Sequence, residues 1–139
     1  MRVLALDLGD ARIGVAQSDL MGIIANGLET INRTDLQTDL NHIADLVKNN
    51  SVSTVVLGLP INMDGTKGER VDKTYAFSEQ LKNVLPPNVK IDFIDERLTT
   101  VSAERVLLEA DVSRQKRKTV IDKMAATIIL QSYLDKINR

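Results

Sequence analysis

The chain has 139 residues, a length typical of one domain, and its 43% hydrophobic and 27% charged residues exclude a disordered or fibrous protein. It has no cysteine, which excludes thiolate catalysis, a zinc–thiolate cluster and a disulfide framework. Its net charge of -1 means that any attraction for a polyanion has to come from a local basic patch.

The first half of the chain contains short apolar runs and one amphipathic stretch. Runs bounded by glycine-containing turns predict strands, and the first two runs are close enough to form a tight hairpin. Gly22 and Gly27 mark turn or bulge points around the third strand. The predicted elements are strands over residues 3–6, 13–16 and 23–31, followed by a helix over 34–50.

The second half alternates strands and helices. Residues 55–59 are apolar on both faces, which is typical of a central strand covered by helices on each side. The whole order predicts one α/β domain over residues 1–139, with a mixed sheet and helices on both faces. The elements after the central strand are a helix over 71–84, a strand over 89–94, a short helix over 101–108, a basic loop over 113–118 and a helix over 121–133.

Asp7 is an acidic residue inside the otherwise apolar first strand. Alternate residues of a strand face the same way, so Asp7 shares a face with Val3 and Ala5 and is partly buried. A bound metal ion would offset the cost of burying this carboxylate, and so would a lysine partner or a turn-capping role. Arg12, in the turn after Gly9, is a candidate contact for an anion, although a surface arginine in an ordinary turn fits equally well.

Asp95 and Glu96 stand together at the exit of the last predicted strand. Ligands of open α/β sheets bind at this edge. Because neighbouring residues of a strand point to opposite faces, at most one of the two acids can join Asp7. The alternative is that both acids favour the start of the next helix, where Thr99 or Thr100 would be the N-cap.

A basic segment from Ser113 to Lys118 precedes Asp122, which we place in the first turn of the last helix. Helical spacing puts Asp122 with Ala125 and Ala126 on the side that packs against the sheet. A carboxylate beneath a cationic loop suits a metal site that meets phosphate. Lys118, four residues earlier, could instead neutralise Asp122 in a structural ion pair.

The three separated carboxylates of Asp7, Glu96 and Asp122 predict a site for Mg²⁺ or Mn²⁺, because these hard cations prefer oxygen ligands. Two such ions can activate a water and stabilise the leaving oxygen of a phosphodiester. His42, the one histidine, falls on the polar side of its helix. We therefore expect His42 at the surface and not in the chemistry.

The candidate substrate contacts are polar or basic. Asn62 and Thr66 follow the central strand, where Thr66 is also a candidate helix cap and an ordinary loop is the simpler interpretation. Two tyrosines and two phenylalanines make a stacking platform for unpaired bases hard to assemble, so we expect recognition of backbone or shape. The full set is Arg12, Asn62, Thr66, Arg97, Arg114, Lys116, Arg117 and Lys118.

Taken together, these segments resemble the YqgF family, whose members are described as Holliday junction resolvases and as pre-16S rRNA nucleases. The resemblance spans nearly the whole chain, and the joint occurrence of its motifs in this order is specific. Asp111 stands where the family pattern predicts glycine, which adds a negative charge near the expected phosphate path. The matching segments are residues 6–9, 12–16, 58–60, 62–66, 95–100, 116–118, 122–126 and 129–134.

The resemblance implies an RNase H-like fold with a mixed five-stranded sheet, in which three antiparallel strands are followed by two parallel ones. It implies a cytoplasmic hydrolase whose Asp7, Glu96 and Asp122 match the family's acidic triad and hold Mg²⁺ or Mn²⁺. The implied activity is endonucleolytic processing of the 5′ end of precursor 16S rRNA in ribosome biogenesis. Nucleic acid is then the partner, with ribosomal particles as a further one and no membrane.

Three other functions stay open from the sequence. The substrate could be a four-way DNA junction, because nothing in the sequence distinguishes recognition of the 2′-hydroxyl from recognition of DNA shape. The chain could also be a non-catalytic nucleic-acid-binding module. A nucleotide-binding relative of the actin-like and sugar-kinase folds is disfavoured, because the second lobe is missing at this length.

Overall fold

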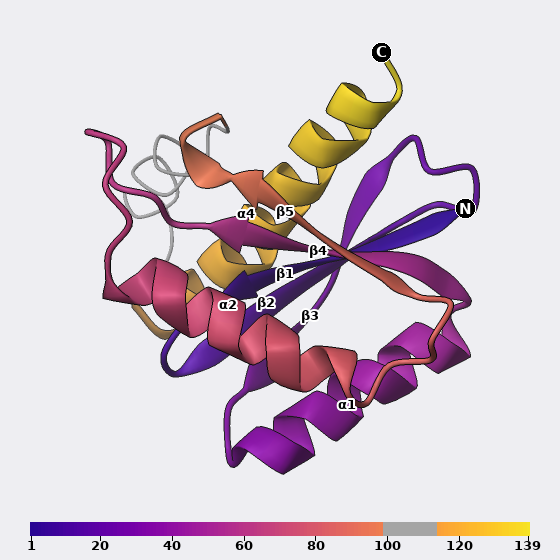
Figure 1. The fold of residues 1–139 in the computed structure, drawn as a ribbon, viewed down its shortest axis with the longest axis horizontal. Helices are drawn as coiled ribbons and strands as arrows, with labels where there is room; N and C mark the ends of the chain where they lie inside the picture. Colours follow the sequence, from indigo (N-terminus) through magenta and orange to yellow (C-terminus); the bar gives the residue numbers. More distant parts are fainter. Residues whose placement is uncertain (99–113) are drawn as a thin grey trace.

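A computed structural model of the chain describes residues 1–98 and 114–139. Its sheet has five strands in the order β3-β2-β1-β4-β5, and helices lie on both faces (Figure 1). The strands are β1 (Arg2–Leu8), β2 (Arg12–Ser18), β3 (Ala25–Asn32), β4 (Val52–Leu59) and β5 (Lys90–Asp95). The helices are α1 (Leu36–Asn49), α2 (Glu69–Lys82), the short 3₁₀ helix η1 (Glu96–Leu98) and α4 (Arg114–Ile137).

The strand directions confirm the expected mixed sheet. β1, β2 and β3 form two antiparallel pairs, whereas β1, β4 and β5 are parallel. In the β2–β3 pair Val15 pairs with Glu29 and Ala16 with Gly27, so Leu28 is an extra residue in β3. This is a β-bulge next to Gly27, one of the two glycines that the sequence analysis gave as turn or bulge points.

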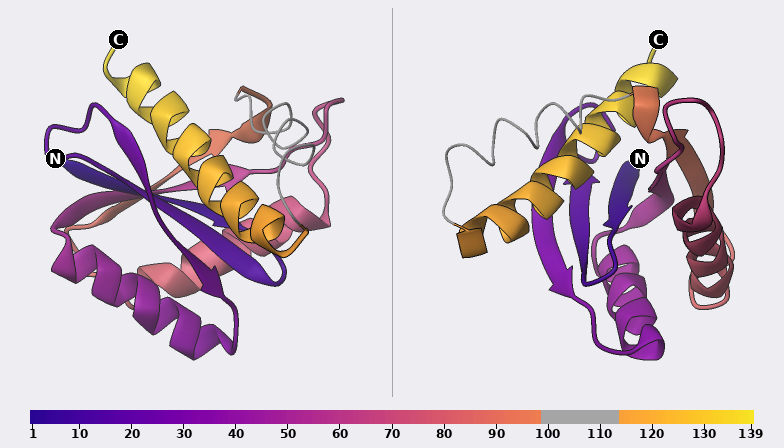
Figure 2. Two further views of the ribbon diagram at one scale, coloured as in Figure 1. Left: turned by 180° about the vertical axis from the view of Figure 1, so that it is seen from behind. Right: turned by 90° about the vertical axis from the view of Figure 1, so that its left-hand side faces the viewer.

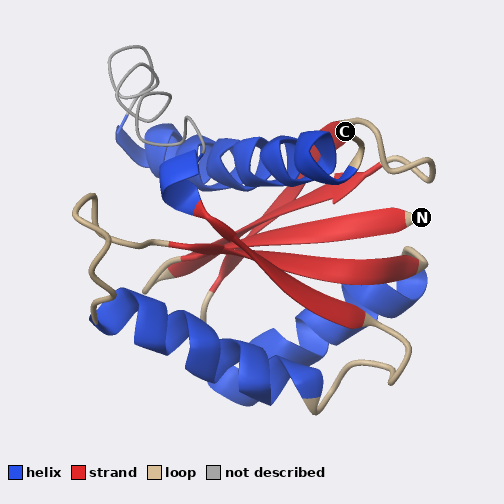
Figure 3. Cartoon of the chain, turned by 45° about the horizontal axis from the view of Figure 1, so that its top comes forward, coloured by secondary structure: helices blue, strands red, loops and turns tan. Residues whose placement is uncertain are grey.

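Different layers cover the two faces of the sheet (Figure 3). α1 and α2 pack on one face, over large strand side chains such as Leu4, Leu6 and Leu57. α4 packs on the other face, over small strand side chains such as Ala5 and Ala16. Figure 2 shows α4 running diagonally across the sheet. Among the described residues, no helix is long and apolar enough to cross a membrane.

Three sequence predictions about element boundaries are wrong. β3 begins at Ala25 and not at residue 23, because the backbone N–H groups of Ile23 and Ile24 donate to Asp19 Oδ1, at 2.7 and 3.0 Å, in the preceding turn. Thr66 does not cap α2, whose N-cap residue is Gly68. The segment 113–118 is not a basic loop, because α4 is already helical from Arg114.

That last difference has a simple cause. Lysine, arginine and glutamine are good helix formers, so a basic run before an apolar helix extends the helix rather than interrupting it. The predicted short helix over 101–108 and Asp111 lie outside the described residues. The other predicted helices and strands are present with small shifts of their ends.

Candidate active site

Asp7 lies near the carboxyl end of β1, on the face that α4 covers. Val3 and Ala5, which share its parity along the strand, belong to the core beneath α4, as the alternation predicts. The Asp7 side chain is buried, with 6% of the residue exposed. Its neighbours across the sheet are both glycines. Gly14 of β2 pairs with Asp7, and Gly58 of β4 directly follows the residue that pairs with Leu6.

Gly14 allows α4 to lie directly on the sheet. An ideal Cβ atom at Gly14 would be 1.9 Å from the backbone oxygen of Asp122, so no larger residue fits without moving the helix. This contact places Asp122 next to Asp7 across the β1–β2 pair. Ala125 and Ala126 are fully packed on the same side of α4, as helical spacing predicts. Asp122 is not in the first turn, however, since α4 begins about two turns earlier.

Gly58 makes the corresponding space for Glu96 on the other side of Asp7. An ideal Cβ atom at Gly58 would lie 2.9 Å from Glu96 Oε1 and 2.8 Å from the tip of Ile129 in α4. Glu96 therefore lies over β4 on the α4 face. Of the two neighbouring acids, this is the one that the structure brings to the side of Asp7.

Asp95 forms an ion pair with Arg97 instead. Its Oδ2 atom lies 2.7 Å from Arg97 Nη2, and the backbone N–H of Arg97 donates to its Oδ1 at 2.9 Å. The Arg97 guanidinium lowers the pKa of the Asp95 carboxyl, and this pairing in turn raises the pKa of Arg97. Arg97 is thus a partner of Asp95 in this structure, and it keeps a third of its side chain exposed.

The result is a row of acidic residues across three adjacent strands. Asp122 lies over Gly14, Asp7 projects from β1, and Glu96 lies over Gly58. Neighbouring strands are about 4.8 Å apart, so this arrangement concentrates carboxylates at one end of the sheet. The sequence indicated the three acids but missed the two glycines as spacers. A glycine inside a strand is the signal that could have found them.

The donor atoms of this row fit a hard divalent cation, because all of them are carboxylate oxygens. In the structure, though, no group of three acidic or histidine residues in the described parts of the chain is close enough to hold a metal ion. The Asp122 carboxylate accepts a hydrogen bond from Arg12 Nε at 2.8 Å. Arg12 is therefore the ion-pair partner of Asp122, and the Lys118 side chain lies outside the described parts.

The remaining candidate contacts are distributed over two regions. Asn62 and Thr66 hydrogen-bond to each other at 2.9 Å, and Thr66 Oγ1 donates to Asp64 at 2.6 Å, so both side chains organise the exposed loop after β4. Arg114, Lys116, Arg117 and Lys118 occupy the first turns of α4, with side chains outside the described parts. His42 is half-exposed and contacts Glu29, away from the acidic row, as expected.

Comparisons with known proteins identify the family. The family model described as "RuvX: Holliday junction resolvase" matches residues 1–136. A protein of Halalkalibacterium halodurans named "Putative pre-16S rRNA nuclease" is 53% identical over 138 residues, which cover 98% of this chain and 97% of that protein. A protein of the same name from Halothermothrix orenii is 52% identical, with 100% of this chain and 98% of the relative covered.

Solved structures share the fold at low sequence identity. Thermus thermophilus RuvC in complex with a Holliday junction substrate has a TM-score of 0.62 and 10% identity, with 98% of this chain and 96% of that chain covered. The fowlpox virus Holliday junction resolvase has a TM-score of 0.56 and 13% identity, with 99% of both chains covered. The expected RNase H-like fold and the resemblance drawn from the sequence motifs are both confirmed.

Proposed function

The chain belongs to the RuvX family of Holliday junction resolvases, and from this we propose that it is a metal-dependent endonuclease that processes the 5′ end of precursor 16S rRNA. The observation that carries the proposal is the row of Asp122, Asp7 and Glu96 on one face of the sheet. The name shared by relatives at about half identity supports the RNA substrate. Such processing belongs to ribosome biogenesis in the cytoplasm, with ribosomal particles as a further partner.

In this proposal Asp7, Glu96 and Asp122 hold Mg²⁺ or Mn²⁺. The bound ions would activate a water and stabilise the leaving oxygen of the phosphodiester. The protein contributes the position of the three carboxylates, because two glycines bring α4 and Glu96 against β2 and β4. Arg12 neutralises Asp122 in this structure. If Asp122 held a cation instead, Arg12 would be available to contact a substrate phosphate.

Basic and polar groups around the row would bind the nucleic-acid backbone. The first two turns of α4, with Arg114, Lys116, Arg117 and Lys118, precede the contact of Asp122 with the sheet. These turns extend α4 beyond Asp122. Their positive charges would offset the repulsion between the acidic row and a polyanion. Arg97, together with Asn62 and Thr66, borders the row from the ends of β5 and β4. Recognition of the backbone in this way explains binding by a chain with a net charge of -1.

A four-way DNA junction is the second candidate substrate. The description of the matched family and the fold shared with two junction resolvases favour it. The catalytic groups would be the same, and only the shape of the bound nucleic acid would differ. The two candidates are therefore separated by substrate and not by chemistry.

Cleavage assays test both candidates together. Precursor 16S rRNA and a synthetic four-way DNA junction are incubated with Mg²⁺, with Mn²⁺ or with a chelator, using the wild type and Glu96→Gln. Asp45→Asn, an exposed acid of α1 on the other face, is the control for a general change in charge. We expect metal-dependent RNA cleavage that only Glu96→Gln abolishes. Junction cleavage alone would favour the second candidate, and cleavage unaffected by the chelator would contradict both.

A further inference from the structure

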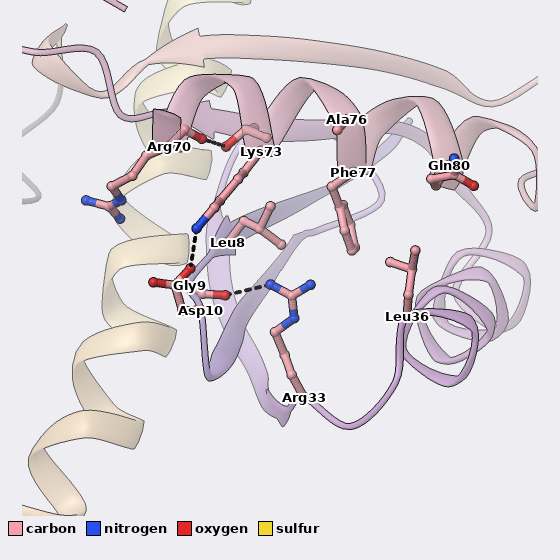
Figure 4. A pocket seen from close by; sticks show the side chains of 11 residues that line it. Leu8, Gly9, Asp10, Arg33, Leu36, Arg70, Lys73, Ala76, Phe77 and Gln80 are labelled. Carbon is pink, nitrogen blue, oxygen red and sulfur yellow. Dashed lines mark hydrogen bonds and ion pairs between the residues drawn. The ribbon is translucent and has the colours of Figure 1, made fainter. Parts of the chain in front are cut away.

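A cavity of about 380 Å³ opens on the sheet face opposite the acidic row (Figure 4). Its walls are the β1–β2 hairpin turn, the loop between β3 and α1, and the first three turns of α2. Leu8 lines it and directly follows Asp7 in β1. The cavity and the acidic row therefore share one end of the central strand, on opposite faces of the sheet. The proposed nuclease chemistry makes no use of this cavity.

The floor of the cavity is apolar and holds a fixed arginine. Arg33 donates from Nη1 to the backbone oxygen of Gly9 at 2.8 Å, and its Nε lies 3.7 Å from the buried Asp39. Its guanidinium carbon is 5.6 Å from the ring centre of Phe77. Leu36, nearly half exposed, borders the same floor. The interactions of Arg33 within the described residues leave Nη2 free to donate to a ligand.

The rim of the cavity is cationic. Lys73 and Arg70 of α2 line its mouth, and Lys73 Nζ lies 3.7 Å from the carboxylate of Asp10 and 3.6 Å from that of Glu69, both of them well exposed. Figure 4 shows Lys73 and Arg33 converging on the hairpin turn from two different elements. Asp39 and Glu69 do not line the cavity, so its charged lining residues are three cations, Arg33, Arg70 and Lys73, and one acid, Asp10. Both contacts of Lys73, with Asp10 and with Glu69, are long and exposed to solvent, so an anion can displace them at little cost.

We propose that this cavity binds one nucleotide, with its base on the apolar floor beside Arg33 and its phosphate at Lys73 and Arg70. An inorganic anion would make no use of the apolar floor, and an uncharged apolar ligand would make no use of the cations at the rim. A base with a phosphate satisfies both, and guanidinium planes are common stacking partners of unpaired bases. The cavity starts one residue after Asp7. We therefore take the nucleotide to belong to the nucleic acid bound at the acidic row, as one of its unpaired nucleotides. This last assignment rests on the proposed nuclease function.

Three probes separate the chemistry of the ligand. Adenosine, inorganic phosphate and adenosine 5′-monophosphate are titrated into the wild type, and backbone amide shifts are followed by NMR in the presence of a chelator, so that no cleavage occurs. We expect the monophosphate to bind at least about tenfold more tightly than either part alone. The shifts should be concentrated at Gly9, Arg33 and residues 70–80. Equal affinity for phosphate and monophosphate would overturn the proposal.

Two variants of α2 test the location. Lys73→Gln removes the phosphate contact and should weaken monophosphate binding about three- to tenfold without changing adenosine binding. Ala76→Phe fills the cavity from an exposed position and should weaken both. Lys82→Gln removes the same charge from the far end of the same helix and should change neither. Loss of binding in Lys82→Gln equal to that in Lys73→Gln would overturn the location.

Two RNA duplexes identify the source of the nucleotide, one fully paired and one with a single unpaired nucleotide. If Lys73→Gln weakens only the binding of the duplex with the unpaired nucleotide, the ligand is a nucleotide of the substrate. If both duplexes bind alike while the monophosphate still depends on Lys73, the ligand is a free nucleotide. All of these affinities are measured without cleavage. The binding results can therefore be interpreted even if the nuclease proposal fails. If the protein cleaves RNA but Lys73→Gln changes none of these affinities, the nucleotide site in the cavity is refuted and the nuclease proposal is not.

Discussion

The two faces of the sheet are built from residues of different size. Under α1 and α2 the strands present mainly leucine, isoleucine and valine, and the cavity there has an apolar floor and a cationic rim. Under α4 they present mainly alanine and valine, with Ile94 at the edge in β5, and glycine where the helix comes closest. The face with large side chains supplies most of the apolar burial. The face with small side chains brings a helix backbone against the sheet and places the three acids on one side of it.

One face therefore contributes mainly to the stability of the fold, and the other mainly to the positions of the acidic residues. Large side chains gain more from burial and keep a helix at a distance. Small ones gain less but let the backbone of Asp122 contact Gly14. Substitutions on the first face should therefore lower the free energy of unfolding, and substitutions on the second should lower activity.

The largest effect is expected for Asp7→Asn. Loss of this carboxylate removes a proposed metal ligand, and metal ions contribute several kcal/mol to transition-state stabilisation, so the cleavage rate should fall roughly a thousandfold. Single-turnover cleavage of precursor 16S rRNA measures it. Thermal unfolding of the same preparation serves as the control for folding. Cleavage at the wild-type rate would contradict the assignment of the acidic row.

On the other face, Leu57→Ala should lower the free energy of unfolding by about 2–5 kcal/mol, because it leaves a cavity in a fully buried core. Urea denaturation measures the change. At a temperature where the variant is folded, its cleavage rate should stay within about twofold of the wild type, since residue 57 points away from the acids. A hundredfold loss of cleavage by the folded variant would show that the two faces are not separable.

The two glycines of the acidic face should differ from each other. Gly14→Ala meets the backbone of α4 and should lower the free energy of unfolding by about 1–3 kcal/mol together with the cleavage rate. Gly58→Ala meets side-chain atoms of Glu96 and Ile129 and no backbone, and side chains can move. It should therefore lower the cleavage rate with little change in stability. Paired denaturation and cleavage measurements decide, and equal stability losses would contradict the difference.

The smallest effect concerns Tyr133 of α4, whose hydroxyl donates to Asp92 Oδ2 of β5 at 2.8 Å. Tyr133→Phe should lower the free energy of unfolding by about 1 kcal/mol near neutral pH. Burial and the Asp92 carboxylate raise the pKa of Tyr133 to about 12. A raised pKa favours the neutral phenol in the folded state, so this stabilisation is complete below pH 10 and is lost as the pH rises from 10 to 12.

Denaturation curves at several pH values test that dependence. The wild type should lose stability between pH 10 and 12, and Tyr133→Phe should lose less over the same range. Tyr75→Phe, which removes a hydroxyl from a partly exposed ring on the other face, is the matched control. An identical pH dependence in the wild type and Tyr133→Phe would rule out the contribution of the hydroxyl.

The sequence allowed prediction of the fold and of the side on which Asp7 and Asp122 lie, and it limited the third acid to one of Asp95 and Glu96. Alternation along β1 placed Asp7 with Val3 and Ala5, and helical spacing placed Asp122 with the alanines, because both periodicities are local properties of the chain. The pairing of Arg12 with Asp122 could not be predicted in this way. The two residues are far apart in the chain and meet only because α4 crosses β2.

The start of α4 was missed for a related reason. A basic run carries no apolar periodicity, so the pattern ended at residue 121 although the helix begins at Arg114. The role of the glycines beside Asp7 was missed because a glycine has no side chain from which a contact could be inferred. Their function depends on what approaches them, and only the packed structure shows that.

The position of Asp7 in β1 also bears on how the sheet assembles. A slip of one residue in the pairing of this strand would exchange its two sets of side chains between the layers. Asp7 would then enter the leucine-rich layer, and Leu6 and Leu8 would be placed under α4, where the helix backbone lies directly on Gly14. Misaligned pairings are thus penalised on both faces at once. Asp7, which we assign to the chemistry, therefore also favours the correct alignment of β1 during folding.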